Sequence, residues 1–414
     1  MSIETVDRYL DVGDLKRAEI LIARLLRASA QDSEDQAQVL LRRSRVRLLS
    51  EKPDEALNDL QACLTMQPWL ADQPQVMELQ ADISFARFEL APVGFADRAN
   101  ADRALACYDL LIRQYPEYAN LGWLLYQKGR VLISADQTEE AVTAFRQALE
   151  KPSHIVALPA LCYERLGFVE LFDYRNPVSA LAYFTQAAQL YPSGENAGWL
   201  VQLHILRSRA LREQRRYTEA LVVARQAHAI IDMSAPDYHR TLAEAYLAIG
   251  EALAHIPGRD EDAIEYLVQF LLISRRPLGV DVTWSQVYET IAGLSFRLER
   301  YEQALASYLH TLAFNPYHPL AATLFYQIAR CYYRIGSYKK VVETIDQMQH
   351  LALADNAPIR DHRVYNVLGN AWFSLRKYQQ AAEAYEQALA LSPGGEYEVQ
   401  IQTYLRLSQK LSVG

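Results

Sequence analysis

The sequence has little glycine, proline and cysteine, and each shortage excludes a class of protein. It has 16 glycines and 16 prolines in 414 residues, too few for a disordered chain or for a fold of many short strands. The four cysteines lie far apart and form no Cys-x-x-Cys pair, so zinc binding and thiol redox chemistry lack support. Half of the residues are hydrophobic, which is enough to build a large buried core.

Long apolar runs and a basic leader pattern are missing as well. No run approaches the ~18 residues that a membrane helix needs. The N-terminal segment is acidic and amphipathic, whereas a signal peptide begins with basic residues and continues with an apolar stretch. The cysteines all fall in helical patterns and are expected to be buried free thiols, which fits a reducing compartment: Cys63, Cys107, Cys162 and Cys331. We therefore expect a cytoplasmic protein that does not bind a membrane. The net charge of -8 argues against a general nucleic-acid binder.

The clearest pattern that is present lies in residues 364–393. Apolar side chains recur at steps of three and four over residues 364–375 and again over 379–391, which predicts two amphipathic helices. Pro393 and the two glycines after it end the second helix, because proline cannot continue a helix and glycine suits its end. Such a hairpin cannot bury its own apolar stripe, so it needs a neighbour on each side.

This hairpin closely resembles the tetratricopeptide repeat. That family has an aromatic residue, a Leu-Gly pair and a Tyr in its first helix, and Ala, an aromatic residue, Ala and Pro in its second helix. The positions that carry the resemblance are Tyr365, Leu368, Gly369, Trp372, Ala381, Tyr385, Ala388 and Pro393. The resemblance implies an all-α fold in which helix pairs stack into a right-handed α-α superhelix, an α-solenoid.

The pattern recurs along the whole chain with less regularity. The small residue that opens each second helix marks ten repeats, spaced by 37 to 48 residues, whereas the family consensus has roughly 34. These marker residues are Ala18, Ala56, Ala104, Ala141, Ala180, Ala220, Ala263, Ala304, Val341 and Ala381. We expect about ten repeats over residues 1–395 and one capping helix over residues 396–414, with Val399, Tyr404, Leu405 and Leu411 facing inward.

The sequence carries no catalytic motif. Nucleophile elbows, phosphate-binding loops, His-x-x-x-His pairs and Gly-x-Gly-x-x-Gly are all missing, and the repeats leave no segment for a catalytic domain. The run of three acids at 260–262 is interpreted as a capped helix start rather than a metal site. We therefore expect a chain that is not an enzyme, with no cofactor, no metal and no small-molecule substrate.

The resemblance also implies where a partner would bind. In the family, the first helices line a concave groove, and peptides contact the residue just after the small residue of the Leu-Gly pair and the residue one turn before it. The first of these positions maps to Arg45, Arg130, Arg209, Glu244, Arg330 and Asn370, and the second to Leu41, Tyr126, Ile205, Arg240, Tyr326 and Asn366. The candidate partner-binding residues are Arg130, Arg209, Arg330, Tyr126, Tyr326, Asn366 and Asn370.

Four arginines at one repeat position suggest a groove for an acidic or carboxylate-ended peptide. Guanidinium groups pair with carboxylates through two parallel hydrogen bonds, and tyrosine adds flat apolar area. The competing interpretation is that these arginines are ordinary helix-surface charges, or that they pair with Glu or Asp on the adjacent helix. Asn366 and Asn370 resemble asparagines that hold a peptide backbone in some members, although the family's full carboxylate-clamp set is not matched.

These patterns favour a non-catalytic scaffold that binds a peptide or a partner protein. One alternative is a regulatory sensor that acts on a separate output protein, because the repeat spacings resemble those of bacterial helix-pair regulators. A second alternative is RNA binding through the arginine rows at 42–47 and 207–216, which the acidic net charge disfavours.

Overall fold

The computed structural model describes residues 3–11, 14–28, 33–91, 97–192, 197–235, 237–354, 361–393, 395 and 397–412 of the 414. The regular structure of this part is helical throughout, with 21 α-helices and one short 3-10 helix at Pro68–Asp72. The all-α fold that the sequence predicts is therefore confirmed. The chain divides into two compact units, unit 1 (Met1–Asn196) and unit 2 (Ala197–Gly414). None of the described helices is both long and apolar enough to cross a membrane.

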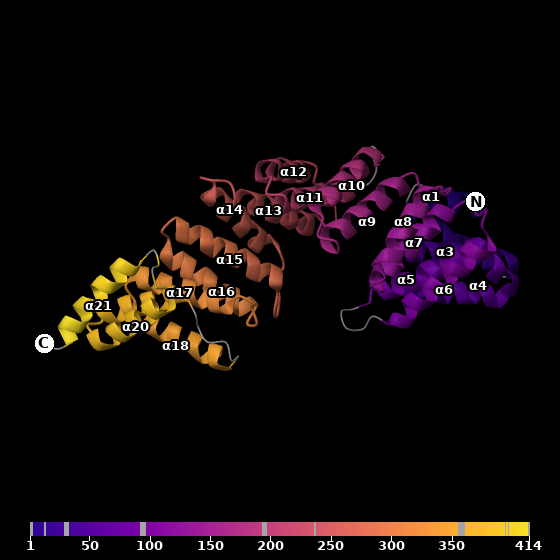
Figure 1. Ribbon diagram of the computed structural model, residues 1–414. Helices are drawn as coiled ribbons and strands as arrows, with labels where there is room; N and C mark the ends of the chain where they lie inside the picture. Colours follow the sequence, from indigo (N-terminus) through magenta and orange to yellow (C-terminus); the bar gives the residue numbers. More distant parts are fainter. Residues whose placement is uncertain are drawn as a thin grey trace. The chain divides into compact units, whose positions relative to one another are not determined.

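Unit 1 consists of five helix pairs, drawn in indigo to magenta in Figure 1. Within it, the second helix of one pair packs on the first helix of the next, for example α6 on α7. Its helices are α1 (Ile3–Asp11), α2 (Leu15–Ala28), α3 (Ser33–Leu49), α4 (Pro53–Met66), α5 (Pro74–Glu89), α6 (Arg98–Gln114), α7 (Leu121–Ser134), α8 (Thr138–Leu149), α9 (Leu158–Phe172) and α10 (Pro177–Leu190).

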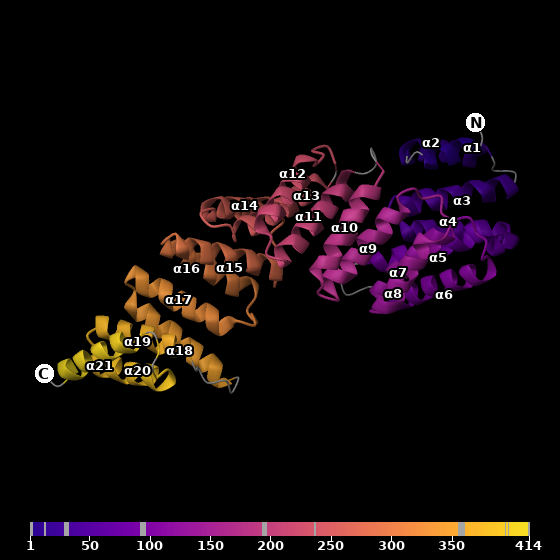
Figure 2. The same cartoon turned by 45° about the horizontal axis from the view of Figure 1, so that its top comes forward.

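Unit 2 consists of five further pairs and one last helix, drawn in magenta to yellow in Figure 2. The same order of packing holds here, for example between α16 and α17. Its helices are α11 (Ala197–Glu213), α12 (Tyr217–Ala229), α13 (Tyr238–Leu253), α14 (Asp260–Ile273), α15 (Val282–Arg297), α16 (Tyr301–Phe314), α17 (Ala321–Ile335), α18 (Tyr338–Ala354), α19 (His362–Ser374), α20 (Tyr378–Leu391) and α21 (Glu398–Ser412).

The repeat register predicted from the sequence is confirmed at the marker residues. All ten have a relative exposure of 0%. The ring four residues after the marker packs against a small residue of the preceding helix: a Cβ added to Gly129 would lie 2.5 Å from Phe145, and one added to Gly369 would lie 2.6 Å from Tyr385. The small residue is therefore required because a large side chain of the second helix occupies the space next to it.

A common turn joins the helices of most pairs. Five positions before the marker, the backbone is left-handed at Glu51, Asp136, Arg175, Arg215, Gly258, Glu299, Gly336 and Arg376. At six of these turns the next amide donates to the carbonyl five residues earlier, as from Gln137 N to Leu132 O at 2.9 Å, which is the pattern of a Schellman cap. Six of these eight turn residues carry a side chain, although a left-handed conformation costs such residues about 1 kcal/mol.

The seventh repeat corrects the register that the sequence assigned. In α13 the close-contact residue is Gly250, where an added Cβ would lie 2.7 Å from Leu267, four residues after the marker Ala263. Glu251, and not Glu244, therefore follows the close-contact residue, and Arg240 does not lie one turn before it. The Leu242-Ala243 pair is two turns too early, and it imitates the family pattern because apolar residues cover much of the circumference of α13.

The last helix, α21, packs on α20 as expected, but only part of the predicted face is correct: Leu405 packs inward, and the Tyr404 ring contacts those of Phe373 and Tyr385. Ile401 and Leu405 pack with Tyr385 in one hydrophobic cluster. Val399 is 79% exposed and Leu411 is 41% exposed, so the prediction that they face inward is wrong. The buried residues Ile401 and Ser408 define the contact stripe, which the sequence left ambiguous because apolar residues lie on more than one side of this helix. The assignment of α21 as a cap for residues 1–395 stays a prediction.

Candidate functional site

Each first helix presents one residue directly after its close-contact residue, and we call this the face position. In α3 and α11 the close-contact residue is a serine, whose hydroxyl donates to the carbonyl of the marker twelve residues later: Ser44 to Ala56 (2.8 Å) and Ser208 to Ala220 (2.9 Å). The face positions are Arg45, Asp82, Arg130 and Phe168 in unit 1, and Arg209, Glu251, Gly293, Arg330 and Asn370 in unit 2.

Asp82 and Asn370 are equivalent in contacts as well as in position. The Tyr108 hydroxyl donates to Asp82 Oδ1, and the Tyr385 hydroxyl donates to Asn370 Oδ1 at 2.8 Å. Both tyrosines stand four residues after a marker. A tyrosine at the equivalent position therefore orients a carboxylate in unit 1 and a neutral amide in unit 2.

Arg130 is paired inside unit 1. Its Nη2 lies 2.5 Å from Glu89 Oε1 on α5, and its Nη1 donates to Gln127 Oε1 at 2.9 Å. Its guanidinium lies 4.9 Å from the centroid of the Phe85 ring. Arg130 thus matches the competing interpretation, an arginine paired with an acid on the adjacent first helix.

Arg209 lies in the field of an acid on the next first helix. Burial raises the pKa of Glu251, while the charges of Arg212 and Arg209 act to lower it. Arg212 Nη2 lies 2.5 Å from Glu251 Oε2. The face positions of α11 and α13 are therefore opposite in charge, as are those of α5 and α7.

Arg330 has different surroundings. Its guanidinium carbon lies 4.4 Å from the ring centroid of Phe296 and 5.7 Å from that of Tyr326, and its Nη1 donates to Gln327 Oε1 at 2.8 Å. Among the residues that the structure describes, no carboxylate forms an ion pair with it. The positive charge is held against aromatic faces, which attract a cation without neutralising it.

The first helix before that of Arg330 has no acid at its face position, where Gly293 stands. It occupies the face position of α15, and a Cβ added there would meet no atom within 4 Å. In unit 1 the first helix before that of Arg130 is α5, and its face position carries Asp82. A glycine inside a helix costs about 1 kcal/mol relative to alanine, and no close packing at Gly293 requires it.

Helix α19 adds polar groups beside α17. Asn370 Nδ2 lies 3.5 Å from Asn366 Oδ1. The Arg363 guanidinium lies 5.4 Å from the Tyr326 ring and pairs with Asp361 at 2.6 Å, which links the two helices. We call Gly293, Tyr326, Arg330, Asn366 and Asn370 together the Arg330 face.

The structure brings together only part of the set predicted from the sequence. Arg330, Tyr326, Asn366 and Asn370 share the Arg330 face, whereas Arg130 and Arg209 lie on other helices with acids nearby. Tyr126 is 4% exposed and packs against the rings of Trp123 and Phe145, so it belongs to the core of unit 1 and gives no surface to a partner. The sequence interpretation missed Gly293, Phe296 and Arg363. A glycine in the middle of a helical pattern was the signal available for the first of them.

The arginine row on α3 is largely neutralised. Arg42 lies 3.1 Å from Asp7, and Arg43 and Arg47 lie 2.6 and 2.7 Å from the buried Asp59. Arginines that are already paired release few counterions on binding a phosphate backbone, which is the main source of affinity for nucleic acid. The RNA-binding alternative therefore gains no support from this helix.

The acidic run at 260–262 begins a helix, as predicted, but the expected cap is missing: Arg259 is the N-cap residue, and no side chain caps this helix start. Asp260 is the first residue of α14, and Asp260 and Glu261 pair with Arg297 and Arg300 of the next repeat. No group of three or more His, Cys, Asp or Glu side chains able to hold a metal ion occurs in the described part of the chain.

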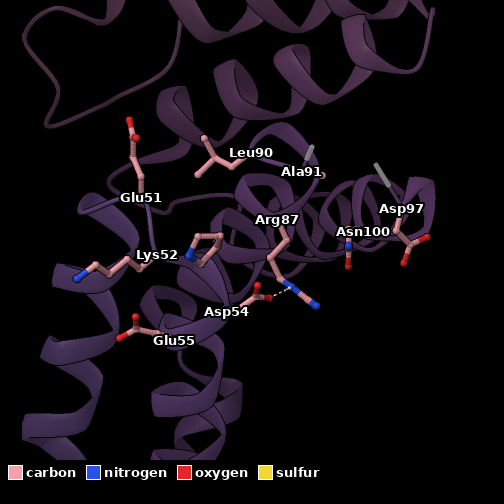
Figure 3. Close-up of a pocket in the computed structure, with 10 residues that line it drawn as sticks. Glu51, Lys52, Asp54, Glu55, Arg87, Leu90, Ala91, Asp97 and Asn100 are labelled. Carbon is pink, nitrogen blue, oxygen red and sulfur yellow. Dashed lines mark hydrogen bonds and ion pairs between the residues drawn. The ribbon is translucent and has the colours of Figure 1, made fainter. Parts of the chain in front are cut away.

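A cavity of about 500 Å³ lies between the α3–α4 turn and the end of α5 (Figure 3). Arg87 and Asp54 point toward each other there, with 2.8 Å between Arg87 Nε and Asp54 Oδ1. Most of the charged side chains that line it, such as Glu51 and Asp97, are exposed to solvent. They are well hydrated without a ligand, so this cavity offers no strong site.

Two segments of the chain match family models described as tetratricopeptide repeat. They are residues 362–394, which contain α19 and α20, and residues 124–150, which contain most of α7 and all of α8. No curated protein sequence matches the chain significantly.

Solved structures share the fold at low identity. The chain is similar to the apo form of the quorum sensor NprR from B. thuringiensis, with 12% identity and a TM-score of 0.55, over 75% of this chain and 86% of that one. It is also similar to a signal transduction ATPase with a tetratricopeptide-repeat sensor from Pyrococcus horikoshii, with 14% identity and a TM-score of 0.56, over 91% of this chain and 55% of that one. At these identities the likeness concerns the fold alone. The matched repeats, the confirmed marker register and the stacked helix pairs together make this chain a tetratricopeptide-repeat protein.

Proposed function

We propose that this protein is a non-catalytic interaction scaffold and that its Arg330 face binds a carboxylate of a partner peptide or protein. The observation that carries the proposal is the contrast between Arg330 and Arg130, the face-position arginine at the equivalent point of unit 1. Arg130 is occupied by Glu89, whereas Arg330 rests on Phe296 and Tyr326 with no carboxylate paired to it among the described residues.

The surroundings of Arg330 suit a peptide that carries an acidic side chain or a free C-terminus. The guanidinium offers hydrogen-bond donors in a geometry that matches a carboxylate. Asn366 and Asn370 offer amide groups for a peptide backbone, one turn apart on α19. Gly293 leaves the helix surface open at the position where α5 carries an aspartate. Aromatic rings around an arginine are also typical of the residues that contribute most to binding energy.

The regulatory alternative remains compatible with this face. Both structural relatives described above have a sensor in their names, and a sensor would use the same carboxylate recognition to report on a partner. In this chain it would act on a separate output protein. Arg330 would be equally necessary in either role.

The experiment is a binding assay with a peptide library. Random octapeptides are anchored by their N-termini, half with a free C-terminal carboxylate and half amidated, and are probed with the full chain. We expect the wild type to select peptides that carry carboxylates, and Arg330→Gln to lose roughly tenfold or more in affinity, as expected for a charged hydrogen bond.

Gly293 supplies a matched pair of variants. Gly293→Glu places a carboxylate where α5 has Asp82 and should neutralise Arg330, so that peptide binding is lost. Gly293→Ala should bind as the wild type does, and both variants should fold at least as well because glycine is removed from a helix. Equal peptide binding by all four proteins, or no preference for carboxylates, would show that the Arg330 face is not the binding site.

A further inference from the structure

A second cavity in unit 1 is lined by charges of both signs. It has a volume of about 370 Å³ and lies among α3, α5 and the turn between α6 and α7. Arg45 comes from α3, Glu78 and Asp82 come from α5, and His154 comes from the turn before α9. Concave sites of this size in which a few polar groups converge are typical of small-ligand binding.

Glu78 is held in a fixed orientation. Its Oε2 accepts the Tyr118 hydroxyl at 2.6 Å, and its Oε1 accepts Asn120 Nδ2 at 2.8 Å. Asn120 is fixed in turn, because its Oδ1 accepts the Ser153 hydroxyl at 3.0 Å. A carboxylate oxygen has two lone pairs, so each oxygen of Glu78 keeps one acceptor site for a further donor.

Asp82 lies one helical turn from Glu78 and is desolvated with it. Burial, and then the charge of Glu78, raise the pKa of Asp82 to about 7, against the lowering effects of the Tyr108 hydrogen bond and of Arg130 and Arg45. Burial also raises the pKa of Glu78. Two desolvated carboxylates one turn apart disfavour each other's charge, and a bound cation would remove that penalty.

Arg45 forms the opposite wall. Its neighbours on α3 are paired with acids, namely Arg42, Arg43 and Arg47. In the described part of the chain, no ion pair joins Arg45 to Glu78, Asp82 or another acid, although its charge acts to lower the pKa of Glu78. The cavity therefore separates an unpaired guanidinium from two carboxylates.

We propose that this cavity binds a free amino acid, with the ammonium at Glu78 and Asp82, the carboxylate at Arg45 and the side chain against Leu48 and Leu79. Charge complementarity favours a ligand that carries both groups. An amine alone would leave Arg45 without a partner, and a carboxylate alone would face Glu78 and Asp82. The apolar leucine wall favours an amino acid with an aliphatic or aromatic side chain. The site lies in unit 1 and shares no residue with the Arg330 face, so either proposal can fail without the other.

The test screens the proteinogenic L-amino acids at millimolar concentration against the full chain, by thermal shift and then by equilibrium dialysis with the best one radiolabelled. The controls are the N-acetyl derivative and the decarboxylated amine of that amino acid. We expect the amino acid to bind and each control, which lacks one charge, to bind roughly tenfold or more weakly. If no amino acid binds, or if the amine alone binds equally well, the proposal is wrong.

Variants then locate the ligand. Arg45→Gln and Glu78→Gln should each weaken binding by roughly tenfold or more, whereas Arg42→Gln, on the same helix but outside the cavity, should leave it unchanged. Affinity should also fall from pH 8 to pH 6, because Asp82 with a pKa of about 7 must lose its proton to receive an ammonium group. Binding that persists in both cavity variants would place the ligand elsewhere and overturn the proposal.

Discussion

In unit 1 the face positions of α3, α5 and α7 carry Arg45, Asp82 and Arg130, so the charge alternates from one repeat to the next. In unit 2 the face positions of α15, α17 and α19 carry Gly293, Arg330 and Asn370, and one positive charge has no acid at the neighbouring face positions. The two units are built from the same helix pairs with the same turns. The difference teaches that a repeat fixes where a side chain is presented, whereas the neighbouring repeats decide whether that side chain is free to bind.

The largest expected effect comes from glycines that occupy different environments in one unit. Gly369→Val should destabilise unit 2 by ~1–3 kcal/mol, because its side chain would overlap the buried ring of Tyr385. Gly293→Ala should stabilise it by about 1 kcal/mol, because the space there is open and alanine is the better helix former. Denaturant unfolding of both variants measures the two changes. A similar change in both would show that the close contact at Gly369 is not tight.

A smaller effect is expected from exchanging the residue types at Asp82 and Asn370. These two side chains accept hydrogen bonds from Tyr108 and Tyr385. The pKa of Asp82, about 7, lies above that of an unfolded carboxyl group. The folded state therefore keeps a proton that the unfolded chain releases, and stability falls as pH rises from about 4 to about 7. Asp82→Asn should remove this fall and stabilise the protein at pH 8.

The reciprocal change should transfer the same pH dependence to unit 2. Asn370→Asp places a carboxylate next to the Tyr385 hydroxyl, so its stability should fall over the same pH range. Asp102→Asn, at an exposed site on α6, serves as the control and should have no effect. Thermal unfolding at pH 5 and pH 8 gives the comparison. Parallel curves for Asp82→Asn and the wild type would mean that Asp82 has an ordinary pKa.

The smallest effect is expected from reversing the two arginine charges. Arg130→Glu should cost about 1 kcal/mol, because it removes an ion pair and sets three acids together with Glu89 and Asp82. Arg330→Glu should cost roughly 0.5 kcal/mol, the size of a lost cation–π contact at a partly exposed ring. High salt should reduce the difference between the stability losses of the two variants, because it screens charge interactions. If both variants lose the same stability at low salt, the pairing contrast between the units is not energetically significant.

Much of the fold was predictable because the same packing constraint recurs in each helix pair. The marker alanines are separated from the close-contact residues by twelve or thirteen positions in most pairs, so the small-against-large packing leaves a visible period. The predicted register of the seventh repeat was wrong because α13 is apolar around much of its surface, so the pattern fits two registers. The buried face of α21 was predicted partly wrongly for a related reason. Only the contact with α20 decides that Ile401 is buried and Val399 is exposed.

The sequence predicted where the candidate site residues lie in the repeats, but not which side chains contact them. The sequence placed Arg130 and Arg330 at equivalent points of two repeats, and the structure confirms that equivalence through Gly129 and Ala329, each twelve residues before a marker. It could not show that Glu89 reaches Arg130 or that Phe296 lies under Arg330, because these contacts join different repeats.

By itself, the sequence determined the helix pairs, their number and the residues that most pairs bury, because these depend on a periodicity within a few turns of helix. Only the tertiary structure decided which charges neutralise each other, which glycine leaves open space, and that Glu78, Asp82 and Arg45 line one cavity. Such outcomes depend on side chains from separate repeats meeting across about 40 residues of chain, and no local pattern encodes that distance.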